Sequence, residues 1–245
     1  MTLWRVVGLV LLLAAMAAVT RGAGERWIVL ALGVFLLVPL ALSLWQQARF
    51  RRALFRADLE AVLFVLQNQA KDQDIGVYQL LAATAYAAFG FVEDARTALA
   101  RASQTGTWVV ALEQRVLVEV MLDVYEGERL RALRKAALLV ELPLPRVEYA
   151  ARRRVHILRQ GIGALARAFA RKPNPGDATR LEHTEKEVPV LVWAMRYARA
   201  ILAVDAGHGE EVVRLLADAP PWSTKSAFAA YHTELLTHSP AGERP

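Results

Sequence analysis

The sequence predicts an all-α protein in which an N-terminal two-span transmembrane hairpin precedes a domain of repeated helices. Three observations support this. The stretch from Trp27 to Trp45 has no charged residue, apolar side chains recur at helical spacing from residue 49 onward, and single glycines separate successive helical segments. The predicted domains are 1–48 for the hairpin, 49–238 for a cytoplasmic helical domain and 239–245 for a disordered tail.

The apolar stretch Trp27–Trp45 has the length of a membrane span. Its 19 residues would rise roughly 28 Å as a helix, about the thickness of the hydrocarbon core of a bilayer. The tryptophans at its two ends match the aromatic belts found at membrane interfaces. We therefore predict that this stretch crosses the membrane.

An earlier apolar stretch, Leu3–Val19, leaves two interpretations open. As a retained span it forms a hairpin with the second stretch, and Arg5 reaches the lipid headgroups. As a signal peptide it would be cleaved after its small residues near Ala18. The domain prediction uses the first interpretation.

Four arginines directly after the second span predict the orientation of the chain. Arg49, Arg51, Arg52 and Arg56 outnumber the positive charges of the short linker between the spans. The positive-inside rule then places the rest of the chain in the cytoplasm, as expected for a multi-pass protein of a bacterial inner membrane. The same arginines are candidates for contact with anionic headgroups, each contributing about 1 kcal/mol.

Composition and motifs exclude several kinds of chemistry. The chain has no cysteine, so disulfides, thiolate catalysis and cysteine-type zinc sites are excluded. It carries no phosphate-binding glycine loop, nucleophile elbow or His-Glu-x-x-His motif. His183 lies among three glutamates, a conceivable metal site of a membrane-bound hydrolase, but we interpret segment 171–187 as a charged surface loop. We predict no enzyme activity, cofactor or metal.

The stretch "AYAAFGFVEDARTALARA" carries small residues at regular intervals after an aromatic one. Residues 79–102 resemble a tetratricopeptide (TPR) repeat, a helix–turn–helix unit of about 34 residues. The resemblance places Gly90 at the turn and Ala98 outside the packed positions, and it implies that small residues let two helices touch. The matching positions are Ala82, Ala83, Tyr86, Gly90, Ala95, Leu99 and Ala102.

Two fainter matches extend this pattern along the chain. Gly127 precedes Ala132, Ala136 and Leu139, and Gly207 precedes Val212, Leu216 and Ala219 at the same spacing. Gly90 and Gly127 are 37 residues apart, close to one repeat period. An irregular helical bundle is the alternative interpretation of residues 49–238.

Other helices are predicted from periodicity and capping residues. They span residues 108–126 and 128–142, a segment running from Pro189 to about Ala206, and a last helix capped by Ser223. From Tyr149 to Phe169 an unbroken apolar stripe favours one long helix through Gly161 and Gly163, although a turn at these glycines is the alternative.

The long helix is rich in arginine, and these side chains are the candidate binding residues. They are Arg146, Arg152, Arg153, Arg159 and Arg167. The functional interpretation is a strip that docks an acidic protein, an anionic membrane or nucleic acid, and the alternative is a solvated helix face. Nucleic acid is least favoured, because no stacking aromatics interrupt the strip.

Together these patterns predict a membrane-anchored TPR-like scaffold or adaptor. The resemblance implies a helical array that binds a partner protein near the lipid bilayer. The alternative function is a small accessory subunit of a membrane transport or enzyme complex.

Overall fold

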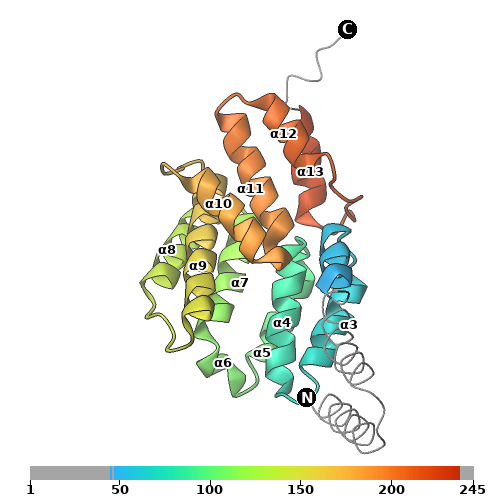
Figure 1. Ribbon diagram of the computed structural model, residues 1–245, viewed down its shortest axis with the longest axis vertical. Helices are drawn as coiled ribbons and strands as arrows, with labels where there is room; N and C mark the ends of the chain where they lie inside the picture. Colours follow the sequence, from blue (N-terminus) through green and yellow to red (C-terminus); the bar gives the residue numbers. More distant parts are fainter. Residues whose placement is uncertain (1–44, 46, 238–245) are drawn as a thin grey trace, which may run out of the picture. The chain divides into compact units, whose positions relative to one another are not determined.

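The computed structural model describes residue 45 and residues 47–237 of the chain (Figure 1). Within these residues every regular element is helical, which confirms the all-α class. The contacts divide the chain into two units, residues 1–50 and 51–245, and the second contains all the helices discussed below. They are α3 (Leu59–Gln69), α4 (Ile75–Ala88), α5 (Val92–Ala102), α6 (Thr107–Val110), α7 (Leu112–Tyr125), α8 (Arg129–Glu141), α9 (Tyr149–Phe169), α10 (Asp177–Glu187), the 3-10 helix η1 (Pro189–Leu191), α11 (Val192–Asp205), α12 (Gly209–Leu216) and α13 (Ala227–Thr237).

The predicted transmembrane hairpin lies outside the described residues, apart from residues 45, 47 and 48. So does the predicted disordered tail. In the part of the chain that the structure describes, no helix combines the length and the apolar character that a membrane crossing requires.

Eight of the helices form four consecutive hairpins. The pairs α4/α5, α7/α8, α9/α10 and α11/α12 each pack against each other, and the first helix of each hairpin also contacts the first helix of the next (Figure 1). The second helix of one hairpin contacts the first helix of the following one as well. Neighbouring hairpins therefore share one apolar core.

Three of the four hairpins turn at a glycine in the left-handed conformation. The φ angles of Gly90, Gly127 and Gly207 are 75°, 80° and 74°. In each turn the residue after the glycine donates its N–H to a carbonyl five residues earlier, at 2.8–2.9 Å. This is the helix ending that glycine favours, because it has no Cβ to clash. Arg171, with φ 56°, holds the same place between α9 and α10.

The residues that follow these glycines are buried at the predicted spacing. Positions five, nine and twelve residues after the glycine face the partner helix, and the fully buried ones are Ala95, Leu99, Ala102, Ala132, Ala136, Leu139, Val212 and Leu216. Ala219 completes the set and is half-buried. In the first hairpin the small residues Ala95 and Ala102 are inaccessible to solvent.

Ala98 corrects the prediction for α5. We expected it to lie away from the packed positions, but it is only 4% exposed. The reason is that α5 contacts α7 as well as α4. A second helix therefore covers the face on which Ala98 lies.

Segment 171–187 is also corrected, because most of it is helix and not a loop. Residues 177–187 form α10, whose Leu181 and Thr184 are inaccessible to solvent. The sequence analysis missed these two buried positions because the segment is polar and two prolines precede the helix. The loop is confined to residues 171–176.

Two predicted helix boundaries are wrong. The predicted helix 108–126 breaks at Ala111 into α6 and α7. Ser226, and not Ser223, caps α13, because its hydroxyl accepts a hydrogen bond from the N–H of Phe228. The Ser226 hydroxyl also donates to the carbonyl of Phe89, and this contact fixes its position.

Helix α9 is one long helix of 21 residues, as its apolar stripe favoured. Gly161 lies where α10 approaches most closely, and a Cβ there would overlap the Thr184 side chain. Thr184 in turn donates to the carbonyls of Ile157 and Arg180, at 3.1 and 2.8 Å. The glycine therefore permits close packing of two helices and does not turn the chain.

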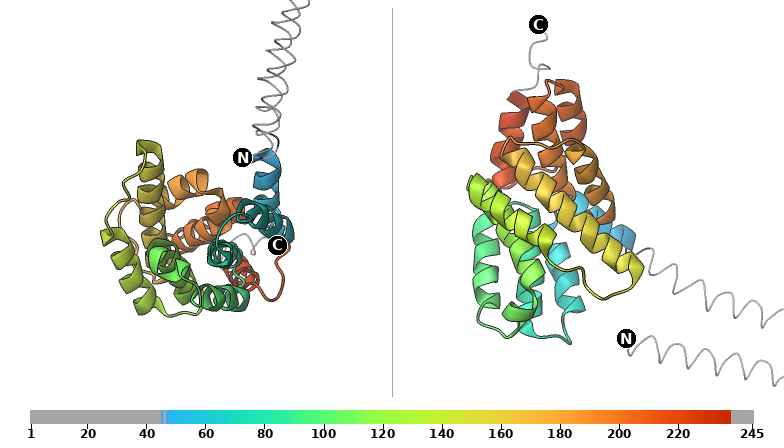
Figure 2. Two further views of the ribbon diagram at one scale, coloured as in Figure 1. Left: turned by 90° about the horizontal axis from the view of Figure 1, so that it is seen from below. Right: turned by 90° about the vertical axis from the view of Figure 1, so that its left-hand side faces the viewer.

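The last helix packs against the first hairpin as well as the last one. In the left-hand view of Figure 2, α13 (red) lies beside α11 and near the end of α4. Phe228 stacks on Tyr197 of α11 at 4.6 Å and meets Tyr125 of α7 edge-on at 5.4 Å. The N–H of Ala227 donates to the carbonyl of Gly90 at 2.9 Å. Helix α13 thus connects the two ends of the hairpin series.

Candidate functional site

The predicted basic strip does not form one exposed surface, because Arg159 belongs to the core. Its side chain is 3% exposed and makes an ion pair with Glu113 at 2.9 Å. It also donates to the carbonyls of Leu142 and Pro143. Arg159 therefore holds the α8–α9 connection against α7, which removes it from the candidate binding residues.

Arg167 also has a structural partner. It donates to both carboxylate oxygens of Asp177, at 2.8 and 2.7 Å, and Asp177 is almost inaccessible to solvent. Burial alone would raise the pKa of Asp177, but hydrogen bonds from Arg167, the N–H of Asn174 and Arg180 outweigh it and lower the pKa. The pair joins the end of α9 to the start of α10.

Only the N-terminal part of the strip remains exposed. Arg153 lies 3.8 Å from the carboxylate of Glu187 and 3.5 Å from the ring of His183. Arg146 and Arg152 are exposed, and their side chains contact no acid among the described residues. Arg154, which the sequence analysis did not select, is also exposed and contacts no acid among the described residues.

The four arginines predicted to adjoin the membrane are exposed in the described part of the chain. Arg49 lies 5.7 Å from the centroid of the Trp45 ring, a cation–π distance. Arg51, Arg52 and Arg56 are exposed and form no ion pair among the described residues. Their charge is therefore available to an external partner.

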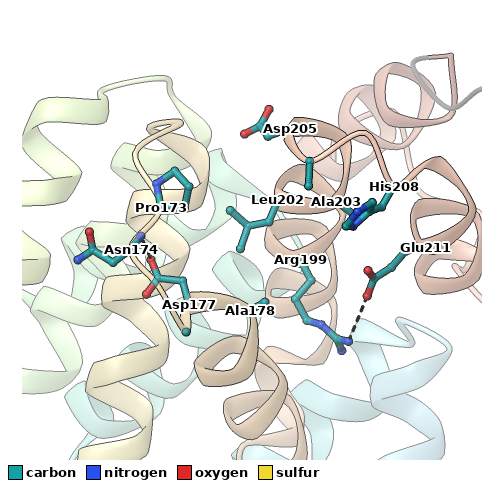
Figure 3. Close-up of a pocket in the computed structure, with 12 residues that line it drawn as sticks. Pro173, Asn174, Asp177, Ala178, Arg199, Leu202, Ala203, Asp205, His208 and Glu211 are labelled. Atoms are coloured by element: carbon teal, nitrogen blue, oxygen red, sulfur yellow. Dashed lines mark hydrogen bonds and ion pairs between the residues drawn. The ribbon is translucent and has the colours of Figure 1, made fainter.

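A cleft of about 420 Å³ lies between the start of α10 and the turn from α11 to α12 (Figure 3). Leu202, Ala203 and Ala178 contribute apolar surface, and Asp205, His208 and Glu211 contribute polar groups. Arg199 neutralises Glu185 at 2.9 Å and approaches Glu211 at 3.9 Å, while Asp205 pairs with Arg171.

The charged groups of this cleft are largely paired with groups of opposite charge. Its lining residues include the carboxylates of Asp177, Asp205 and Glu211 and the imidazole of His208. Its carboxylates are compensated by arginines, which leaves little net charge.

His183 and its neighbours do not assemble a metal site in the described residues. The His183 ring lies 3.9 Å from Glu187, whereas Glu185 forms ion pairs with Arg196 and Arg199 of α11. No set of three histidine, aspartate or glutamate side chains in residues 45 and 47–237 is close enough to hold a metal ion.

The structure reveals an apolar surface that the sequence analysis missed. Val109 and Val110 of α6 are 80% and 84% exposed, and Ile75 at the start of α4 is 68% exposed. The two elements adjoin, because a Cβ on Gly76 would touch Thr107 of α6. We call Ile75, Val109 and Val110 the α6 patch. The break at Ala111 exposes the valines, and the helical periodicity gave no sign of it.

The fold and these surfaces define an all-α protein of consecutive helical hairpins with exposed apolar and basic surfaces. Comparisons with protein-family models, with curated proteins and with solved structures give no match to the chain. The function proposed below therefore rests on the chain's own residues.

Proposed function

We propose that this protein is a membrane-anchored, TPR-like scaffold or adaptor that binds a partner protein at the cytoplasmic face of the membrane. The observation that carries the proposal is the α6 patch on an array of helical hairpins. Exposed apolar side chains on neighbouring elements are typical of sites that bind another protein.

The TPR-like character is supported by two regularities of the hairpins. Three hairpins turn at a left-handed glycine. The same three bury side chains five and nine residues after that glycine. Repeat arrays of this kind bury each hairpin against its neighbours and bind partners on their extended surfaces.

The membrane anchor is supported by the sequence between Trp27 and Trp45 and by the arginines that follow it. A chain anchored in this way keeps its helical unit close to the bilayer. A partner that binds the helical unit is then held at the membrane, which is the task of an adaptor.

The partner surface is argued from the energy of burying apolar side chains. Full burial of a valine or isoleucine side chain contributes roughly 1.5–3 kcal/mol. The three side chains of the α6 patch are more than two-thirds exposed, so the fold uses little of this energy. A partner protein that covers these three side chains would gain this burial energy on binding.

The experiment is affinity purification of the intact protein from mild detergent, with identification of the proteins that accompany it. We expect a partner with the wild type and its loss in the double variant V109E/V110E. V213E is the matched control, because Val213 is an exposed valine on α12, 39% accessible. Equal recovery of the partner with both variants would contradict the proposal.

The accessory-subunit alternative predicts a different outcome. In that case the membrane spans themselves would make the contacts, through small residues such as Ala14 and Ala18. Exchanging residues 1–45 for unrelated spans would then abolish the association, whereas V109E/V110E would preserve it.

A further inference from the structure

The connection between α8 and α9 combines exposed apolar side chains with free arginines. Tyr149 is 82% exposed and Val147 is 50% exposed. Arg146, Arg152 and Arg154 lie among them. We call these five residues the α8–α9 tip.

The fold presents this tip away from the core. All six residues from Tyr149 to Arg154 are exposed, and the first fully buried residue of α9 is Ile157. The right-hand view of Figure 2 shows the start of α9 (yellow) at an edge of its unit. Arg159 holds the base of the connection through Leu142, Pro143 and Glu113. The tip is therefore supported by a buried side chain.

The charges of the tip are not compensated inside the protein. Arg146, Arg152 and Arg154 form no ion pair among the described residues, and only Arg153 is close to an acid, Glu187. Residues 146–154 contain four arginines against one glutamate, Glu148. The tip is therefore positive.

This combination matches the chemistry of an anionic bilayer surface. Tyrosine is enriched where hydrocarbon meets headgroups, aliphatic side chains enter the outer hydrocarbon, and arginine pairs with lipid phosphates. Three clefts of the described part of the chain lie away from the tip, around Ala203, Glu210 and Pro189. The side chains of the tip project into solvent, and a lipid surface can deform to accommodate them.

We propose that the α8–α9 tip binds the surface of an anionic phospholipid bilayer. The inference rests on the membrane anchor proposed above, because a span ending near Trp45 keeps the helical unit within reach of the bilayer. The tip then gives that unit a second membrane contact and restricts its orientation, while the α6 patch is left for a protein partner.

The test uses the absence of cysteine in the chain. The variant A150C places a single thiol beside Tyr149 without changing any tip residue, and a polarity-sensitive fluorophore is attached to it. The full-length protein is reconstituted into vesicles of phosphatidylcholine, alone or mixed equally with phosphatidylglycerol, that contain a quencher on the acyl chains. A100C on α5, also at an exposed alanine, is the matched control.

We expect quenching at position 150 to be about twofold stronger in the anionic vesicles than in the neutral ones. It should fall at 1 M salt, where the Debye length is about 3 Å. The variant R146E/R152E/R154E should abolish the difference, and position 100 should show none.

The contradicting results are equally specific. Equal quenching at positions 150 and 100, or no dependence on anionic lipid, would overturn the inference. So would protection of position 150 that requires an added protein, because the tip would then be a protein-binding surface. Loss of the protein from the vesicles in alkaline carbonate would instead contradict the anchor, whereas a retained protein without quenching contradicts the tip alone.

Discussion

Ala95 shows how a single side chain sets the distance between two helices. It is inaccessible to solvent on α5, where α4 packs against it. Replacing it with leucine adds three carbons where there is no space, so Ala95→Leu should lower the free energy of unfolding by roughly 1–3 kcal/mol. Urea unfolding of the intact protein in mild detergent, followed by circular dichroism, measures this change.

The control for Ala95 is Ala100, an exposed alanine on the same helix. Ala100→Leu should leave the stability nearly unchanged. Ala98 would not serve, because it is buried against a second neighbour. Equal effects at positions 95 and 100 would show that the packing of the first hairpin is wrong.

Asp177 provides a test at the same scale through its titration. Its folded-state pKa lies below that of an unfolded aspartate, about 3.9. Its stabilising effect is therefore complete above about pH 4 and is lost as the pH falls through the lower folded-state pKa. Asp177→Asn should cost roughly 2–3 kcal/mol at pH 7 and make the loss of stability below pH 4 shallower. Unfolding from pH 2 to 7, with the exposed Asp218→Asn as control, checks both effects.

At the residue scale the sequence predicted burial better than it predicted partners. The spacing after Gly90 identified Ala95, Leu99 and Ala102 as packed residues, because helical periodicity is local. The prediction that Arg159 lies on an exposed strip was wrong, because its ion-pair partner Glu113 is 46 positions away in the sequence. An arginine that is buried against a distant carboxylate has the same local sequence as one in solvent.

Among the elements, the contact between α9 and α10 gives the sharpest prediction. Gly161→Ala should force the two helices apart at Thr184 and destabilise the protein by roughly 1–3 kcal/mol. Gly163→Ala should be neutral or stabilise by up to about 1 kcal/mol, because alanine is the better helix former. At Gly163 the nearest atom that a Cβ would meet is Arg167 Nη1, at 3.3 Å.

Thermal unfolding of the two variants, compared with the wild type, measures this difference. If Gly161→Ala melts at or above the wild-type temperature, the close approach of α9 and α10 is refuted. The pair is well matched, because the two glycines are only two positions apart in one helix.

The elements themselves were partly predictable. Glycine turns and apolar stripes indicated α4, α5, α8, α9 and α11, since both signals are local. Helix α10 was missed because its composition is polar and Leu181 is the only apolar residue among its three buried ones, which include Asp177 and Thr184. Tertiary contacts, above all the Arg167–Asp177 pair, stabilise this helix.

At the scale of the whole molecule, we first predict on which side of the membrane each part of the chain lies. A reporter that is active only in the cytoplasm should be active when it is fused after Glu243, because Arg49, Arg51, Arg52 and Arg56 follow the predicted span. The same reporter at Gly24 should be inactive if the first span is retained. Activity only outside the cytoplasm at position 243 would contradict the orientation, and a mature N-terminus near Ala18 would show a cleaved signal.

The arrangement of the whole helical unit was the least predictable level. The contact of α13 with Gly90 joins residues 137 positions apart, as in the bond from Ser226 to Phe89. Periodicity carries no information about such pairs. The exposed α6 patch likewise depends on a helix break that only the surrounding contacts determine.

The most direct test of the central claim, that the α6 patch holds a partner protein at the membrane, is site-specific photo-crosslinking in intact cells. A photo-reactive amino acid replaces Val110, or Val213 as the control, in the full-length protein. The account predicts a discrete adduct with one other protein in the membrane fraction from position 110 and none from position 213. No protein adduct at position 110, or the same adducts from both positions, would contradict it.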